Sequence, residues 1–170
     1  YNNGITGKDT LFIQKASVTV TAVNHGINGK DSLTIKDADI TVTSGGDALR
    51  STNDSDPTLG YLVITGSALK LTAGEDGIQA ETTLTISGGT ATVTTAGGAG
   101  QSISDDTSAK GLKSGTQVTV TGGTFQLNCC DDAIHSNGNV TISGGSFTIA
   151  TGDDGMHADD TLSISSGTID

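Results

Sequence analysis

Residues 131–142 read DDAIHSNGNVTI, and residues 153–164 read DDGMHADDTLSI, which is the same pattern one repeat later. The hydrophobic residue in the middle of this pattern recurs at intervals of 22, 22, 29, 34, 22 and 22 residues along the chain. A period of this size is typical of repeat proteins in which each unit packs on its neighbours. The recurring positions are Ile5, Ile27, Leu49, Ile78, Leu112, Ile134 and Met156.

The repeats are predicted to form strands rather than helices. Apolar and polar residues alternate with a period of two, as in Val18-Thr19-Val20, and β-branched residues dominate. Paired glycines such as Gly144-Gly145 mark turns between strands. Aligned repeats also place like residues in columns, so that each repeat offers three short inward-facing segments. We therefore expect an all-β fold, a three-sided parallel β-helix or solenoid, with about seven rungs of about 22 residues and three short strands per rung.

We expect residues 1–170 to form a single domain that is a segment of a longer secreted chain. The two longer intervals between repeats predict insertion loops near residues 52–59 and 97–109. In a repeat protein such insertions usually become loops over one face, which is often the binding face. An ordinary surface loop is the alternative at each place.

The composition limits the classes of partner. The chain has 19 acidic residues against 8 Lys and Arg, a formal net charge of −11, which argues against nucleic acid and anionic membranes and favours cations. No apolar run is long enough for a membrane helix, so no membrane insertion is expected. A Thr/Ser/Asn/Gly-rich, Lys-poor sequence is typical of an extracellular or cell-surface protein.

Acidic residues gather directly before the recurring hydrophobic position. The doublet Asp131-Asp132 stacks on Asp153-Asp154 if the repeats are in register, and stacked carboxylates repel one another. Ca²⁺ relieves such repulsion with six to eight oxygen ligands. One alternative to calcium is that the acidic face is simply solvated. A second alternative is that Lys110, in the same column, neutralises the carboxylates in place of a metal ion. The predicted calcium ligands are Glu75, Asp76, Asp131, Asp132, Asp153 and Asp154.

A row of long polar residues follows the recurring hydrophobic position by one residue. Such a row offers hydrogen bonds to sugar hydroxyls or to uronate carboxylates. The solvated face of a sheet is the alternative, and the two histidines with nearby aspartates also fit zinc. The predicted carbohydrate-binding residues are Arg50, Gln79, Lys113, His135 and His157.

Four motifs carry a family resemblance. They are EDGIQA at residues 75–80, DDAIHS at 131–136, TISGGSF at 141–147 and GDDGMHA at 152–158. With them, nearly the whole chain resembles the calcium-binding, polysaccharide-lyase-like right-handed β-helix proteins of cellulolytic bacteria, a group of carbohydrate-binding domain-containing proteins. In this chain Ala109-Lys110 replaces one of the family's acidic doublets, which puts metal binding in that repeat in doubt.

The resemblance implies an extracellular protein that binds calcium and a plant-wall polysaccharide, cellulose or pectic acid, without catalysis. One alternative is a structural subunit that assembles head-to-tail into a fibre or surface layer. Another is a calcium-dependent polysaccharide lyase, which needs a Lys or Arg as base, and Arg50, Lys110 and Lys113 are its candidates.

Overall fold

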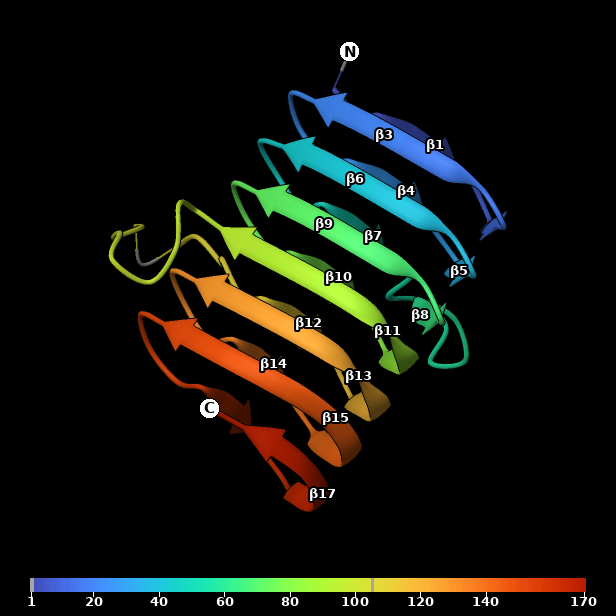
Figure 1. Ribbon diagram of the computed structural model, residues 1–170. Coiled ribbons are helices and arrows are strands. Elements are labelled where there is room, and N and C mark those ends of the chain that lie inside the picture. Colours follow the sequence, from blue (N-terminus) through green and yellow to red (C-terminus); the bar gives the residue numbers. More distant parts are fainter. Residues whose placement is uncertain (1, 105) are drawn as a thin grey trace.

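Residues 2–104 and 106–170 are described by the computed structural model, and they form parallel strands joined by turns and loops (Figure 1). Asp105, within the insertion predicted near residues 97–109, and Tyr1 lie outside the described residues. Among the residues described, no helix has the length and hydropathy needed to cross a membrane.

One sheet has seven strands, each three residues long, in the order of the chain. Every strand that lies between two others buries its first and third residues and half-exposes the second. The strands are β1 (Ile5–Gly7), β4 (Ile27–Gly29), β7 (Leu49–Ser51), β10 (Ile78–Ala80), β12 (Leu112–Ser114), β14 (Ile134–Ser136) and β16 (Met156–Ala158).

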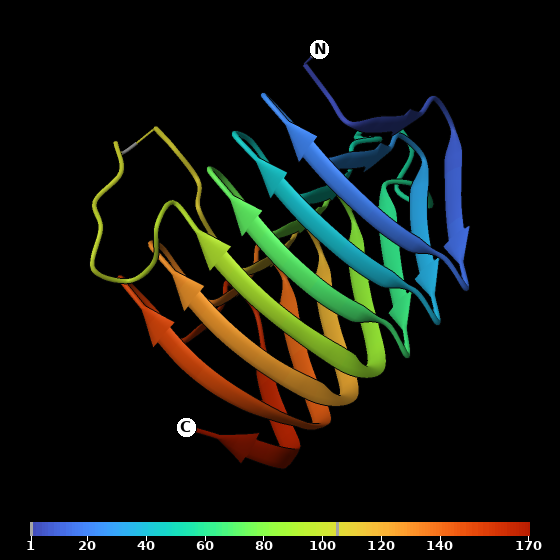
Figure 2. The ribbon, with the colours of Figure 1, turned by 45° about the horizontal axis from the view of Figure 1, so that its top comes forward.

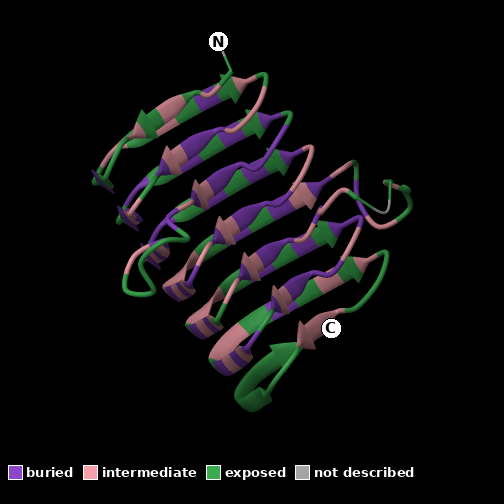
Figure 3. Cartoon of the chain, turned by 180° about the vertical axis from the view of Figure 1, so that it is seen from behind, coloured by how far each residue is buried: buried purple, intermediate pink, exposed green. Residues whose placement is uncertain are grey.

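The second sheet has ten strands, and three of them are 13 residues long. Buried and exposed residues alternate along strands such as Asp39–Ser44 and Ala68–Ala73, as the two-residue period predicts (Figure 3). The strands are β2 (Thr10–Gln14), β3 (Ser17–Ala22), β5 (Ser32–Lys36), β6 (Asp39–Ser44), β8 (Tyr61–Thr65), β9 (Ala68–Ala73), β11 (Thr83–Thr95), β13 (Gln117–Cys129), β15 (Asn139–Thr151) and β17 (Leu162–Ile169).

The structure corrects the expected fold class. Instead of a right-handed parallel β-helix with three short strands per rung, the chain forms two parallel sheets, and the strands pair within each sheet. The ten-stranded sheet curls like half a barrel (Figure 2). The second and third strands predicted for each repeat belong to this one sheet, and in the later repeats they are a single strand.

Glycine pairs explain why the later strands bend without ending. Gly123 and Gly145 have φ values of 119° and 108°, which L side chains rarely adopt, and they lie inside β13 and β15. The register shifts at the equivalent place in β11, as it does at a β-bulge, which bends a strand while pairing continues on both sides. A turn signal in the sequence therefore became a bend within a strand.

The core lies between the two sheets and consists of aliphatic columns. Residues one repeat apart are strand partners, as in Ile78↔Leu112 of the small sheet and Leu62↔Leu84 of the large one. Phe125 and Phe147 face each other in the same way, with ring centroids 4.6 Å apart and planes 8° apart. Like residues therefore stack on like residues through the core.

Two long connections leave the strands. Residues 52–60 join β7 to β8, and residues 96–111 join β11 to β12; in Figure 1 they emerge at different corners of the molecule. The second connection returns to the small sheet, where Ser108 Oγ donates a hydrogen bond of 2.7 Å to Asp76 Oδ1. This contact places the loop over the candidate site.

Candidate functional site

The outward face of the seven-stranded sheet carries one polar side chain per strand. The pairing Arg50↔Gln79, Gln79↔Lys113, Lys113↔His135 and His135↔His157 brings all five predicted carbohydrate-binding residues into a single row. Thr6 and Asn28 extend the row toward β1. We call these seven residues the polar row; at a strand spacing of about 4.8 Å it is about 29 Å long.

The position two residues before the hydrophobic residue of each small strand forms a column that we call the aspartate column. It holds an aspartate in four of the seven strands, namely the buried Asp47, Asp76 and Asp132 and the exposed Asp154. One carboxylate oxygen accepts a backbone N–H from the next repeat: Asp47 Oδ1 from Asp76 at 3.1 Å, and Asp132 Oδ1 from Asp154 at 3.0 Å. Asp76 Oδ1 accepts the Lys110 N–H at 2.8 Å. These carboxylates therefore hold successive repeats together through backbone groups that would otherwise be buried without a partner.

The other carboxylate oxygen of each aspartate faces a basic member of the polar row. Arg50 Nη1 lies 3.1 Å from Asp47 Oδ2, and Lys113 Nζ lies 3.0 Å from Asp76 Oδ2. In the last two repeats the partner is a histidine, with the contacts His135–Asp132 at 2.8 Å and His157–Asp154 at 3.1 Å. The aspartate column and the polar row are thus joined by side-chain contacts, which are ion pairs at Arg50–Asp47 and Lys113–Asp76.

Lys110 takes the place of an aspartate in this column and reverses the charge there. Its Nζ donates to Asp131 Oδ1 at 2.8 Å and to Asp132 Oδ2 at 3.0 Å. Burial lowers the pKa of Lys110, but the two carboxylates outweigh burial and raise it; burial raises the pKa of both aspartates, but the bonds to Lys110 help to lower it. The raised pKa favours the ammonium form of Lys110, which donates to both carboxylates.

The six predicted calcium ligands do not meet at one point. Oxygen atoms of Asp131, Asp132 and Asp153 lie within 4.8 Å of one another, whereas Glu75 groups with His25 and Asp47 instead. The Lys110 ammonium already contacts two of the first three carboxylates, so the fit to Ca²⁺ requires that Lys110 move away. Binding of calcium stays a prediction.

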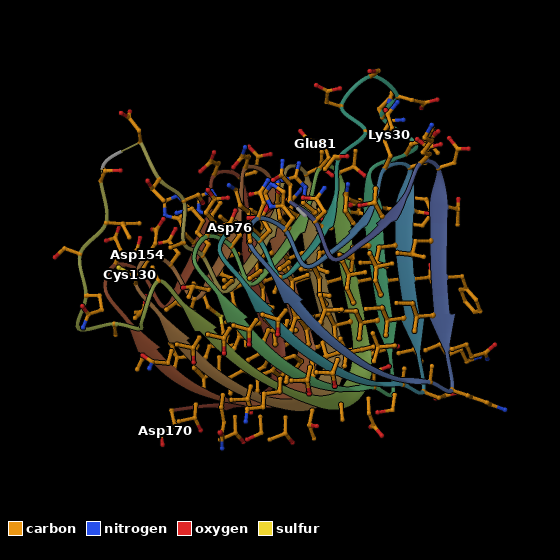
Figure 4. The ribbon with its side chains drawn as sticks, turned by 90° about the horizontal axis from the view of Figure 1, so that it is seen from above. Lys30, Asp76, Glu81, Cys130, Asp154 and Asp170 are labelled. Carbon is orange, nitrogen blue, oxygen red and sulfur yellow. The ribbon has the colours of Figure 1, made fainter. Side chains whose placement is uncertain are left out.

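A pocket of about 330 Å³ opens over the middle of the polar row. Asp76, one of its lining residues, is labelled in Figure 4. Within residues 2–104 and 106–170, the Gln79 amide in this pocket has no hydrogen-bond partner, and neither has the buried Arg50 Nε. The Gln79 amide therefore offers a free donor and a free acceptor to a ligand, whereas the Arg50 Nε is buried beneath the surface. Its lining residues are Asp47, Arg50, Glu75, Asp76, Gln79, Asp106, Thr107, Ser108 and Lys113.

The sequence analysis did not assign a role to His25 or Ser108. His25 Nδ1 accepts the Asp47 N–H at 3.0 Å, and its Nε2 lies 2.7 Å from Arg50 Nη1. Burial and the Arg50 charge lower the pKa of His25, which keeps the ring neutral and able to accept. His25 could have been found from the sequence, because it occupies the aspartate-column position of its repeat. No sequence pattern indicated where Ser108 lies.

The pH dependence of stability should report on Asp47. Burial, and then the nearby Asp76 carboxylate, raise the pKa of Asp47 from 3.8 to about 6 against the opposing effect of Arg50. Because the folded pKa is the higher one, this contribution to stability is complete below about pH 4 and is lost as the pH rises through 6. We expect wild type to lose about 2–3 kcal/mol over this range relative to Asp47→Asn, measured by urea unfolding in chelator. Parallel pH profiles of the two proteins would contradict the assignment.

The comparison with protein families identifies the class of protein. A family model described as "Carbohydrate-binding domain-containing protein" matches residues 1–155, and the chain belongs to this family. Neither the curated proteins nor the solved structures gave a match to the chain.

Proposed function

We propose that this chain binds a neutral polysaccharide along the polar row and holds one sugar unit in the pocket over Gln79. The observation that carries the proposal is the row itself, in which hydrogen-bonding side chains recur at one strand spacing. That spacing is close to the length of one sugar unit in an extended chain, so successive units can meet successive side chains. Membership of a carbohydrate-binding family supports the same role.

The charges around the pocket favour neutral sugars over uronates. Four carboxylates line it, from Asp47, Glu75, Asp76 and Asp106, against the two cations of Arg50 and Lys113. The excess of negative charge repels a uronate carboxylate, while paired acids and bases offer both acceptors and donors to hydroxyl groups. Cellulose fits these conditions, and pectic acid fits them only with a bridging cation.

Affinity should come from many weak contacts in sequence. Among the described residues that line the pocket, none is aromatic, so a sugar ring finds no flat apolar surface to stack on. Each hydrogen bond to a hydroxyl adds only about 1 kcal/mol net. We therefore expect short oligosaccharides to bind much more weakly than an insoluble polymer that covers the whole row.

Gln79→Ala should weaken binding to amorphous cellulose about five- to tenfold, because the side-chain amide in the centre of the pocket is lost. Depletion isotherms measure this directly. Gln79 holds no other described side chain, so the fold should be unaffected. The matched control is Thr6→Ala, in the same row but outside the pocket, which should change binding less than twofold. Equal effects of the two substitutions would contradict a site centred on Gln79.

The calcium part of the proposal is limited to Asp131, Asp132 and Asp153, whose oxygens lie together. When bound, Ca²⁺ would supply a positive charge that can also attract a uronate. Lys110 competes for this position, so Lys110→Met should bind Ca²⁺ at least about tenfold more tightly than wild type in calorimetry. Lys113→Met, which frees only Asp76, is the control. Unchanged calcium affinity in Lys110→Met would remove calcium from the proposal.

An extracellular, non-catalytic role completes the proposal. The composition is low in lysine and strongly acidic, and Lys110 and Lys113 are both ion-paired with aspartates. A lyase would release unsaturated uronates, whose ultraviolet absorbance should stay absent when the protein is incubated with pectic acid and calcium.

A further inference from the structure

Two histidines stack at the end of the polar row. His135 and His157 are partners in neighbouring strands, with ring centroids 4.9 Å apart and planes 19° apart. The Nδ1 of each ring faces a carboxylate, at 2.8 Å for His135 and Asp132 and at 3.1 Å for His157 and Asp154. Two imidazole–carboxylate pairs thus lie side by side in adjacent repeats.

The spacing of these atoms is close to that of a tetrahedral metal centre. In a tetrahedron with bonds of about 2.0 Å, the ligand atoms lie about 3.3 Å apart. One ligand atom each from Asp132, His135 and His157 already lies within 4.8 Å of the other two. Rotation of the two stacked rings toward each other would close the set around one ion, and the exposed Asp154 can follow.

We propose that Asp132, His135 and His157, with Asp154 as fourth ligand, bind a divalent transition-metal cation of the zinc class. Imidazole nitrogen is a ligand for Zn²⁺, Cu²⁺ and Ni²⁺, whereas Ca²⁺ takes oxygen. Two neutral imidazoles and two carboxylates balance the charge of such an ion. The ion would then tie together β14 and β16 through their outward side chains.

The last two repeats differ from the others in a way that permits this. In the earlier repeats Arg50 and Lys113 carry fixed charges that neutralise Asp47 and Asp76. A histidine at the same place can lose its proton and donate a lone pair, so a metal ion can supply the positive charge instead. Lys110 also contacts Asp132 Oδ2, but it keeps Asp131 as a partner when a metal takes that oxygen.

The third histidine provides the control. His25 groups with Asp47 and Glu75 at similar distances, yet its Nδ1 already accepts the Asp47 N–H and its Nε2 faces Arg50. The acceptor nitrogen of His25 is therefore already engaged by a donor, whereas the Nδ1 atoms of His135 and His157 face carboxylates. Cys129 competes weakly for a metal ion, because burial raises the pKa of its thiol to about 12.

The test is a titration of the protein, free of polysaccharide, with ZnCl₂, while the ring nitrogens of the three histidines are followed by ¹⁵N NMR. We expect His135 and His157 to shift at Nδ1 with one Zn²⁺ per chain and His25 to stay unchanged. CaCl₂ should leave all three rings uncoordinated. His157→Gln should lower the calorimetric Zn²⁺ affinity at least about tenfold, and His25→Gln should leave it within twofold.

Several results would overturn the proposal. They are no ring shift at excess Zn²⁺, equal shifts of all three histidines, the same response to CaCl₂, or equal losses in His157→Gln and His25→Gln. The wild-type ring shifts do not depend on any variant folding, and the amide spectrum shows whether each variant is folded. Because no sugar is present, failure here leaves the proposed carbohydrate binding untouched.

Discussion

Phe125→Ala should lower the free energy of unfolding by about 3–5 kcal/mol. Phe125 is only 2% exposed and stacks on Phe147, while its strand partner on the other side is the small Ala91. Ala91 cannot fill the space that the ring leaves, so the substitution costs the transfer free energy of the ring, the cavity and the stacking interaction. Urea denaturation followed by circular dichroism measures the loss.

Phe12 supplies the matched control, because it carries the same ring on the same sheet but is 55% exposed. Phe12→Ala should change the free energy of unfolding by less than about 1 kcal/mol. If the two substitutions cost the same, the stacked phenylalanines are not part of a close-packed core.

Asp76→Ala should cost about 2–4 kcal/mol of stability and also abolish binding to cellulose. The two carboxylate oxygens of Asp76 accept hydrogen bonds from the Lys110 backbone N–H, from Ser108 Oγ and from Lys113 Nζ. Without them, a buried N–H is left without a partner and the loop of residues 96–111 loses its attachment to the small sheet. Because Asp106, Thr107 and Ser108 of this loop line the pocket over Gln79, the pocket loses one wall when the loop detaches.

Asp154→Ala is the control for this position, because Asp154 belongs to the same column but its side chain is 59% exposed. It should cost less than about 1 kcal/mol and leave cellulose binding intact. Hydrogen exchange of the 96–111 amides should rise in Asp76→Ala alone. Unchanged exchange there would show that Asp76 does not anchor the loop.

The sequence predicted the strands well because strand partners carry the same kind of residue. Leu62 and Leu84 could be aligned by their interval of 22 residues, and Val118 by the residues around it, and they are partners in the structure. The predicted three-sided arrangement was wrong because a glycine pair in the sequence is typical of a turn. Whether a chain turns or bends at Gly122-Gly123 depends on pairing with both neighbouring strands, which no single repeat records.

The candidate site was predicted in part for a similar reason. The polar row followed from the period, but its pairing with the aspartate column did not. Asp132 and His135 are three residues apart, and only the turn between them directs the two side chains toward each other. The return of Ser108 to Asp76 joins residues 32 positions apart through a loop without a repeat, so no pattern could indicate it.

The central claim is that the polar row binds a neutral polysaccharide. The most direct measurement is retention of the wild-type protein on insoluble cellulose and on calcium–pectate gel, each with calcium and with chelator. We expect retention on cellulose in both conditions and retention on pectate only with calcium. Failure to bind cellulose in either condition would contradict it.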